Sequence, residues 1–288
     1  MYITLSNEYL TAVLTTKGAQ VRSIKSKEGF QYLWQGRSWS KHAPLLFPVC
    51  GRLKNQKYTY NGKEYSMPPH GFIGGVDFTP VYTSETSAIV SYSSNKSSYS
   101  IYPFNFTFVA RYTLLKNTLL AEFTVTNNGK DSMPHMFGWH PGFVLPGKQP
   151  INSFKLHFEN AGDVMIHPLR EGTAFTSGES NPFALNDGTY YLNEEEIYSN
   201  DTLILSGTGG VAALRCDDSN FGVDLHYSSN LPYFCIWKHP SSKSRFICLE
   251  PWTDIPQDGL CDENFDTRKM QRLDPKESAT YRYAVEFK

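Results

Sequence analysis

Apolar and polar side chains alternate along most of this chain, and this period of two restricts the fold more than any other feature. Residues 10–16 and 21–25 alternate on either side of a short turn, and residues 105–114 and 118–126 form a second alternating pair. Successive side chains of a strand point to opposite faces of a sheet, so this pattern predicts strands with one buried face.

The turns between these segments indicate antiparallel pairing. The clearest hairpin is predicted over residues 58–65, where Asn61-Gly62 suits the positive φ of a type I′ turn. No stretch keeps apolar residues at helical spacing over three turns, so few and short helices are expected. Further strands are predicted at 153–158, 202–206, 211–215, 221–227, 233–237, 245–249 and 280–287. With no fixed repeat and no linker beyond the Ser-rich 91–98 loop, we expect one all-β domain over residues 1–288, a large antiparallel sandwich.

The charge balance and the cysteines restrict the partners and the compartment. The net charge is −1, which supplies no attraction for phosphate backbones or anionic lipid, so nucleic acid and membrane are not expected partners. The start of the chain lacks a signal-peptide pattern, and no apolar run reaches the ~20 residues of a membrane-spanning helix. Five scattered cysteines, none in a C-x-x-C pair, predict neither a disulfide framework nor a thiolate zinc site. A cytoplasmic protein is the expectation.

Two histidines stand in unusual local sequence. His70 follows two prolines and precedes Gly71, a residue that lets the backbone pass close to another group. His140 lies between an aromatic residue and a Pro-Gly turn, where the pKa of an imidazole can be tuned. A solvated loop histidine and a histidine bonded to a backbone carbonyl are the plain structural alternatives. His135 is five positions before His140, so on an extended strand the two would face opposite sides.

Glu250 ends the apolar run that follows Arg245 and precedes Pro251. Burying a carboxylate is costly unless it is paired, and burial would raise its pKa toward the range of a general base. A structural glutamate bonded to a neighbouring arginine is the alternative. Two imidazoles and a carboxylate suit either a His₂Glu metal centre or acid–base work on a sugar. His70 and His140 lie far apart in sequence, unlike the close histidine pairs of many metal sites, so no metal is predicted.

Five motifs in order along nearly the whole chain resemble the aldose 1-epimerase (galactose mutarotase-like) family, most closely its bacterial LacX-like branch. They are Leu46-Phe-Pro-Val-Cys-Gly-Arg-Leu53, Pro69-His-Gly-Phe72, Trp139-His-Pro-Gly-Phe143, Asn200-Asp-Thr-Leu-Ile204 and Cys248-Leu-Glu-Pro-Trp252. The resemblance implies a β-supersandwich and the interconversion of the α and β anomers of a free aldose, without metal or cofactor.

The same resemblance implies roles for individual residues. Glu250 would be the general base at the C1 hydroxyl, and His140 the general acid at the ring oxygen O5. His70 and Arg52 would hold hydroxyls and help polarise O5, and Asp201 matches an aspartate that binds the sugar. Three aromatic residues are candidates for stacking on the pyranose, although each could equally belong to the core: Trp139, Phe143 and Trp237.

The chain departs from the branch at Ile73-Gly74-Gly75, where Ala-Arg-Asp usually follows the His-Gly-Phe motif. This change leaves the substrate open. A hexose-6-phosphate 1-epimerase would need cations over the phosphate, for which Lys238, Lys243 and Arg245 are candidates. A non-catalytic carbohydrate-binding protein would keep the aromatic residues and Arg52 but not need Glu250 and His140. A metal-dependent hydrolase is the third alternative. The oligomeric state, monomer or homodimer, is not set by the sequence.

Overall fold

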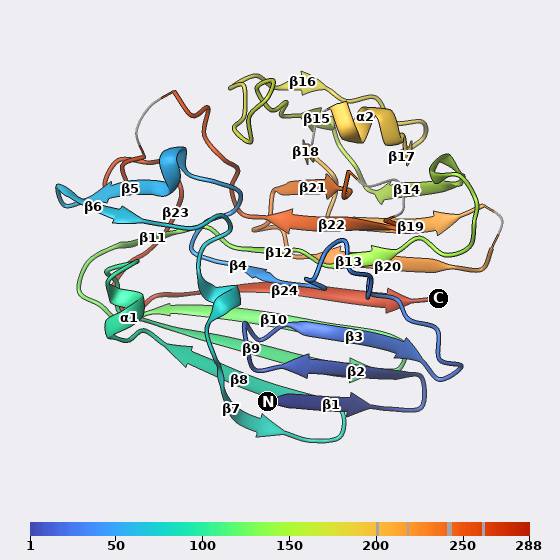
Figure 1. The fold of residues 1–288 in the computed structure, drawn as a ribbon, viewed down its shortest axis with the longest axis horizontal. Coiled ribbons are helices and arrows are strands. Elements are labelled where there is room, and N and C mark those ends of the chain that lie inside the picture. The colour runs from blue at the N-terminus through green and yellow to red at the C-terminus, as the bar shows by residue number, and fades with distance from the viewer. Residues whose placement is uncertain (200–201, 218, 241–243, 261–262) are drawn as a thin grey trace.

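Two large antiparallel sheets make up most of the protein, which we describe from a computed structural model (Figure 1). The structure describes residues 1–199, 202–217, 219–240, 244–260 and 263–288. The first sheet has nine strands, in the order β17 (Thr189–Tyr191), β14 (Phe154–Glu159), β19 (Val211–Cys216), β20 (Gly222–Tyr227), β24 (Ser278–Phe287), β10 (Thr118–Asn127), β9 (Phe106–Leu115), β8 (Ser87–Ser93) and β7 (Thr79–Thr83).

The second sheet has eight strands, and its longer strands lie near the middle of the view in Figure 1. Its order is β16 (Asn181–Pro182), β15 (Met165–Ile166), β18 (Thr202–Ser206), β21 (Tyr233–Trp237), β22 (Phe246–Trp252), β12 (Gly138–Trp139) and β4 (Leu45–Leu46), and β13 (Gly142–Val144) also pairs with β22. Strand β22 is thus hydrogen-bonded on both sides. This pairing holds the side chains of β22 in fixed positions.

The small elements surround these sheets. A three-stranded sheet of β1 (Tyr2–Ser6), β2 (Leu10–Thr15) and β3 (Val21–Ser26) lies in front of β8–β10 in Figure 1. Two-stranded pairs are formed by β11 (Met133–His135) with β23 (Gln271–Leu273), and by β5 (Lys57–Tyr60) with β6 (Lys63–Ser66). The helices are α1 (Lys96–Tyr99), α2 (Glu194–Ser199) and three 3₁₀ turns, η1 (Lys54–Gln56), η2 (Ile73–Gly75) and η3 (Ile151–Ser153).

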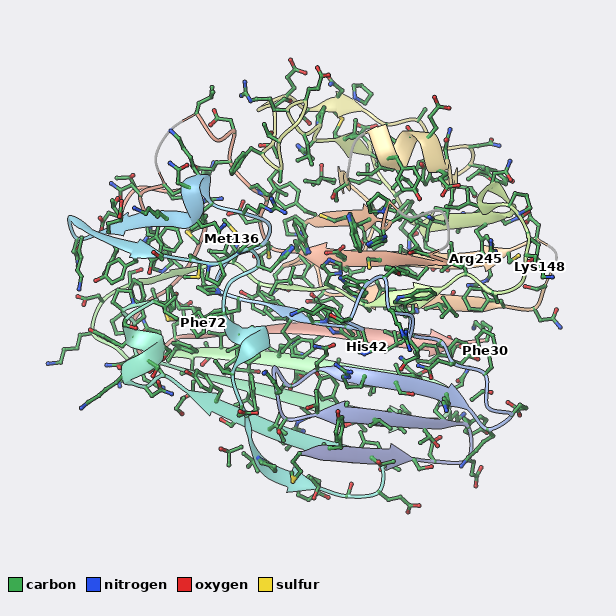
Figure 2. The ribbon with its side chains drawn as sticks, in the orientation of Figure 1. Phe30, His42, Phe72, Met136, Lys148 and Arg245 are labelled. Carbon is green, nitrogen blue, oxygen red and sulfur yellow. The ribbon has the colours of Figure 1, made fainter. Side chains whose placement is uncertain are left out.

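Buried aromatic side chains pack between the two sheets; Figure 2 draws the side chains on the ribbon. The Phe137 and Tyr281 rings stack at 4.4 Å between centroids, and the Trp139 and Tyr283 rings meet edge to face at 5.3 Å. Fully burying such a ring contributes about 2–3 kcal/mol, so this layer is a main source of the fold's stability.

The prediction of an all-β fold with few short helices is confirmed. The hairpin at Asn61-Gly62 is confirmed too, because both residues have positive φ (47° and 69°) and β5 pairs with β6. Part of the Ser-rich 91–98 segment is the one-turn helix α1, which Asn95 caps through its side chain. Among the residues that the structure describes, no helix is long and apolar enough to cross a membrane.

Candidate active site

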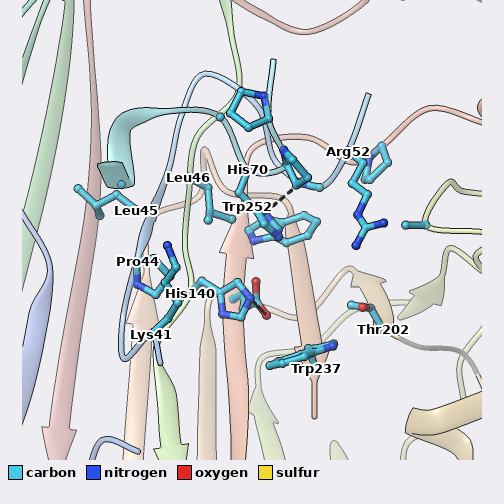
Figure 3. Close-up of a pocket in the computed structure, with 18 of the residues that line it drawn as sticks. Lys41, Pro44, Leu45, Leu46, Arg52, His70, His140, Thr202, Trp237 and Trp252 are labelled. Carbon is cyan, nitrogen blue, oxygen red and sulfur yellow. Dashed lines mark hydrogen bonds and ion pairs between the residues drawn. The ribbon is translucent and has the colours of Figure 1, made fainter. Parts of the chain in front are cut away.

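A cavity of about 680 Å³ opens over the middle of the eight-stranded sheet and collects most of the predicted site residues (Figure 3). Strands β21 and β22 supply its floor, and loops from the first third of the chain supply much of its wall. Its lining includes Trp39, Lys41, Arg52, His70, His140, Thr202, Trp237, His239, Glu250 and Trp252. Cavities of this size, with aromatic walls and a few polar groups, are typical of small-molecule binding.

Glu250 reaches the cavity because β22 alternates regularly through it. The strand was expected to end at this residue, but it continues through Pro251 to Trp252 and pairs with β21 as far as Tyr233. The side chains of Cys248, Glu250 and Trp252 therefore share one face. Glu250 is only 1% exposed, and its Oε2 has no hydrogen-bond partner among the described residues.

His140 follows β12 and approaches the same carboxylate from the neighbouring strand. Its backbone N–H donates to the carbonyl of Pro44 at 3.0 Å, which fixes the residue against the loop before β4. Its Nε2 lies 3.1 Å from Oε1 of Glu250, whereas Nδ1 is buried with no partner in the described part of the chain. No arginine contacts Glu250 there, so the alternative of a structural glutamate–arginine pair is wrong.

Burial shifts the two members of this pair in opposite directions. It raises the pKa of Glu250 well above its usual range, and the neighbouring Trp252 indole offsets this only in part. Burial also lowers the pKa of His140 well below its usual range, with further contributions from His70 and Lys41. In a dry site both ionised forms lose hydration, so a neutral pair that shares one proton is favoured near neutral pH.

His70 is held by the backbone around the cis Phe47–Pro48 bond. It adopts φ +63°, and its own N–H donates to the Gly51 carbonyl at 2.8 Å. Gly71 follows with φ +74°, where a β-carbon would lie 2.0 Å from the Phe47 carbonyl oxygen. The predicted close approach at Gly71 is therefore to the backbone of Phe47.

The hydrogen bonds of His70 also assign its tautomer. The Gly51 N–H donates to Nδ1 at 3.2 Å, so the neutral ring carries its proton on Nε2. Burial, with smaller contributions from Arg52 and Lys41, lowers the pKa of His70 to about 4. The ring is therefore a neutral donor at pH 7, and it lies 5.6 Å from the His140 ring between centroids.

Three tryptophans surround His140, Glu250 and His70. The Trp39 ring stacks on the His140 ring at 5.2 Å, and Trp237 meets the same ring edge to face at 5.7 Å. Gly142 makes room for Trp39, because a β-carbon there would lie 2.7 Å from the indole. Trp252 borders His70, and its indole N–H is buried without a partner among the described residues.

The structure brings five of the eight predicted site residues to the cavity: Glu250, His140, His70, Arg52 and Trp237. Asp201 lies outside the described residues, although its neighbour Thr202 lines the cavity. Sequence reasoning missed Trp39, Lys41 and Trp252. Trp252 could have been found from its alternation with Glu250, whereas Trp39 and Lys41 lie in an irregular segment without a local signal.

Trp139 and Phe143 do not reach the cavity, which corrects their prediction as stacking residues. Trp139 is 1% exposed, donates its indole N–H to the Ala43 carbonyl at 3.1 Å and packs on Tyr283. Phe143 is fully buried in β13. Both lie an odd number of residues from His140, so the extended backbone points them to the opposite side, into the core.

The cations suggested for a phosphate occupy other positions. Lys238 is buried and forms an ion pair with Glu194 at 3.0 Å. Arg245 donates to the carbonyls of Leu145, Pro146 and Gln149, and it lies beside Lys148 in Figure 2. Neither lines the cavity, and Lys243 lies outside the described residues.

One group of side chains has atoms that could bind a metal ion. His140, Cys248 and Glu250 offer a nitrogen, a sulfur and an oxygen, all within 4.8 Å of one another. Zinc accepts such donors, but it needs the thiolate form of cysteine. Burial, with the charge of Glu250, raises the pKa of the Cys248 thiol well above its usual range, so this set is poorly suited to a divalent cation.

Comparisons with known proteins agree with this fold. The family model "Aldose 1-epimerase" matches residues 1–286. The LacX proteins of Lactococcus lactis are 30% identical over 95% of this chain and 96% of their own length. A galactose mutarotase related enzyme from Lactobacillus acidophilus superposes with a TM-score of 0.92 at 28% identity, covering 100% of this chain and 97% of that one. A galactose mutarotase-like protein from Lactobacillus casei reaches 0.94 at 25% identity, with 100% of both chains covered. The chain belongs to the aldose 1-epimerase family.

Proposed function

We propose that the protein is an aldose 1-epimerase that interconverts the α and β anomers of a free aldose by acid–base catalysis. Family membership supports an epimerase or mutarotase in general. The observation that carries the finer proposal is the buried pair of His140 and Glu250, 3.1 Å apart in an aromatic cavity. The two oxygens that must exchange protons in this reaction, O1 and O5, are bonded to the same carbon, and a pair this close can reach both.

The reaction needs one proton taken up and one delivered. Once the shared proton has passed from Glu250 to His140, Glu250 accepts the proton of the C1 hydroxyl while His140 donates to O5, and the C1–O5 bond breaks to leave the open-chain aldehyde. Rotation about C1–C2 presents the other face of the carbonyl. The O5 hydroxyl then attacks C1, returns its proton to His140, and O1 recovers a proton from Glu250. All protons balance over the cycle.

The electrostatics of the cavity suit these transfers. A carboxylate whose pKa is raised is a stronger base, and an imidazolium whose pKa is lowered is a stronger acid. His70 can donate from Nε2 to O5 or to a hydroxyl without a change of charge. The unpartnered Trp252 N–H and Glu250 Oε2 are further groups that sugar hydroxyls can satisfy. The faces of Trp39 and Trp237 can cover the C–H surface of a pyranose.

The test is the rate of anomer exchange of α-D-glucose and α-D-galactose, measured by polarimetry and by NMR exchange. We expect the wild type to accelerate exchange and Glu250→Gln to lose roughly 10²- to 10⁴-fold, the usual contribution of a positioned acid or base. Glu179→Gln, at an exposed position away from the cavity, is the matched control and should retain the rate. Incubation with EDTA should leave the rate unchanged, because no step uses a metal.

Two results would contradict the proposal. Retention of the rate in folded Glu250→Gln would exclude Glu250 as the base. If folded wild-type protein bound sugars but did not accelerate exchange of any neutral or phosphorylated aldose, the protein would be a carbohydrate-binding protein. Loss of the rate with EDTA, restored by Zn²⁺, would instead favour a metal-assisted reaction at His140, Cys248 and Glu250.

A further inference from the structure

Two cations on the cavity wall have no anionic partner among the described residues. Lys41 and Arg52 both line the cavity, are exposed, and make no ion pair or hydrogen bond within the described part of the chain. In Figure 3 they lie on opposite sides of His140. Lys238, next to the cavity residue Trp237, shows the usual alternative, because it is paired with Glu194 at 3.0 Å.

Among the described lining residues, no other group compensates for these charges, and Asp201, which precedes the lining residue Thr202, lies outside them. Glu250 is the only carboxylate among the described lining residues, and it is buried against His140. The positive charge also acts on the imidazoles in the cavity. Lys41 and Arg52 both contribute to the lowered pKa of His70, and Lys41 contributes to the lowered pKa of His140. The imidazoles of His70 and His140 add no negative charge. The described part of the cavity wall therefore carries an excess of positive charge that an anion would neutralise.

The cavity also has space beside one of these cations. Gly74 and Gly75 in η2 line it next to β4. A β-carbon at Gly75 would meet no atom within 4 Å, and at Gly74 the nearest atom is the Leu45 carbonyl oxygen at 3.4 Å. Leu45 and Lys41 lie on the same side of His140 in Figure 3. Because Gly74 and Gly75 have no side chains, the side of the cavity that Lys41 lines has room for a group larger than a hydroxyl.

We propose that the aldose bound in this cavity carries an anionic substituent, a phosphate or a carboxylate group, which Lys41 and Arg52 bind. The inference rests on the proposed function, since it names the substrate class of the same site. In this role Lys41 and Arg52, which flank His140, bind the substituent and take no part in the proton transfers at O1 and O5. A cationic side chain that pairs with phosphate or carboxylate forms a charge-assisted hydrogen bond, stronger than a bond to a neutral hydroxyl.

The experiment compares anomer exchange of glucose and galactose with that of their 6-phosphates and their uronic acids, after subtraction of the rate without protein. We expect kcat/KM for one of the anionic classes to exceed that of the neutral parent sugar by roughly tenfold to a hundredfold. The preference should fall toward one in Lys41→Gln and in Arg52→Gln, and it should weaken with added salt. Lys130→Gln, which removes an exposed lysine far from the cavity lining, is the control and should keep the preference.

A binding measurement separates this inference from the proposed function. Folded Glu250→Gln is titrated with the same sugars and with inorganic phosphate. Binding is followed by tryptophan fluorescence, because Trp39 and Trp237 border the cavity. Anionic sugars that bind more tightly than neutral ones through Lys41, but are not converted by the wild type, would support the inference and refute the epimerase. Conversion of neutral and anionic sugars with equal kcat/KM would leave the epimerase intact and overturn the inference. Equal binding of both classes would overturn it as well.

Discussion

Replacing His135 by glutamine should remove a defined part of the acid sensitivity of this fold. His135 lies at the end of β11, is 0% exposed, and its Nε2 lies 2.7 Å from the hydroxyl of Tyr281. Burial lowers its pKa from 6.5 to about 4 in the folded protein. In the unfolded chain the imidazole is in water and titrates at its ordinary value.

The sign and size of the effect follow from this difference. The unfolded state binds a proton more readily than the folded state, so His135 costs no stability above pH 6.5. As the pH falls from 6.5 to 4, the unfolded state gains about 1.4 kcal/mol per pH unit, up to roughly 3 kcal/mol below pH 4. Between pH 7 and pH 5 the loss from this one residue is about 2 kcal/mol.

The assay is urea unfolding at pH 7 and pH 5, followed by tryptophan fluorescence. Other groups also titrate, so the quantity of interest is the difference between variants. His135→Gln should lose about 2 kcal/mol less than the wild type between the two pH values, even if it is less stable at both. His226→Gln, at an exposed position in β20, should follow the wild type. Equal losses in His135→Gln and the wild type would refute the reasoning, because they would mean that the buried imidazole does not resist protonation.

Two further predictions concern the acid–base pair and its enclosure. The kcat/KM of anomer exchange should follow a bell-shaped pH profile, since the pair works with one proton. The acid limb, where the pair takes up a second proton, lies below pH 6.5 because burial lowers the pKa of His140, and the alkaline limb, where the pair loses its one proton, lies at higher pH because the pKa of Glu250 is raised. Glu250→Gln removes the base, so the acid limb should disappear from its residual rate, whereas the alkaline limb should remain because His140 must still be protonated to donate. A monotonic profile in the wild type would contradict this assignment. Trp39→Ala should expose His140 to water, move the acid limb of the profile toward higher pH and lower kcat/KM by about tenfold. Trp39→Phe is the control, because it should preserve much of the stacking on His140. An unchanged pH profile in Trp39→Ala would show that the indole does not control the burial of His140.

Features set by neighbouring residues could be predicted from the sequence. The hairpin at Asn61-Gly62 depends only on backbone conformations that these residue types adopt readily, and it forms as expected. The opposite orientation of His135 and His140 follows from strand geometry alone: His135 contacts Tyr281 in the core, and His140 faces the cavity. The same geometry argues against Trp139 as a stacking residue, so that error was avoidable from the sequence.

Features set by contacts between distant segments could not be predicted in this way. The Trp39 ring lies on His140 because Gly142 leaves space for it and because the segment before β4 crosses that part of the sheet. Nothing in the residues around Trp39 indicates that contact. The extension of β22 through Pro251 could not be predicted either, because a proline normally ends a central strand. In the structure the pairing with β21 continues across Pro251.

The two halves of the site differ in how they are anchored. Glu250 lies within a strand that is paired on both sides, whereas Lys41, Arg52 and the two glycines of η2 belong to connecting segments. Connecting segments tolerate substitution and changes of length far better than central strands do. A lineage built on this scaffold could therefore exchange one sugar for another by altering these loops, with no change to the residues proposed to open the ring. Ile73-Gly74-Gly75 is a segment of this kind, where a change of sequence could accompany a change of sugar.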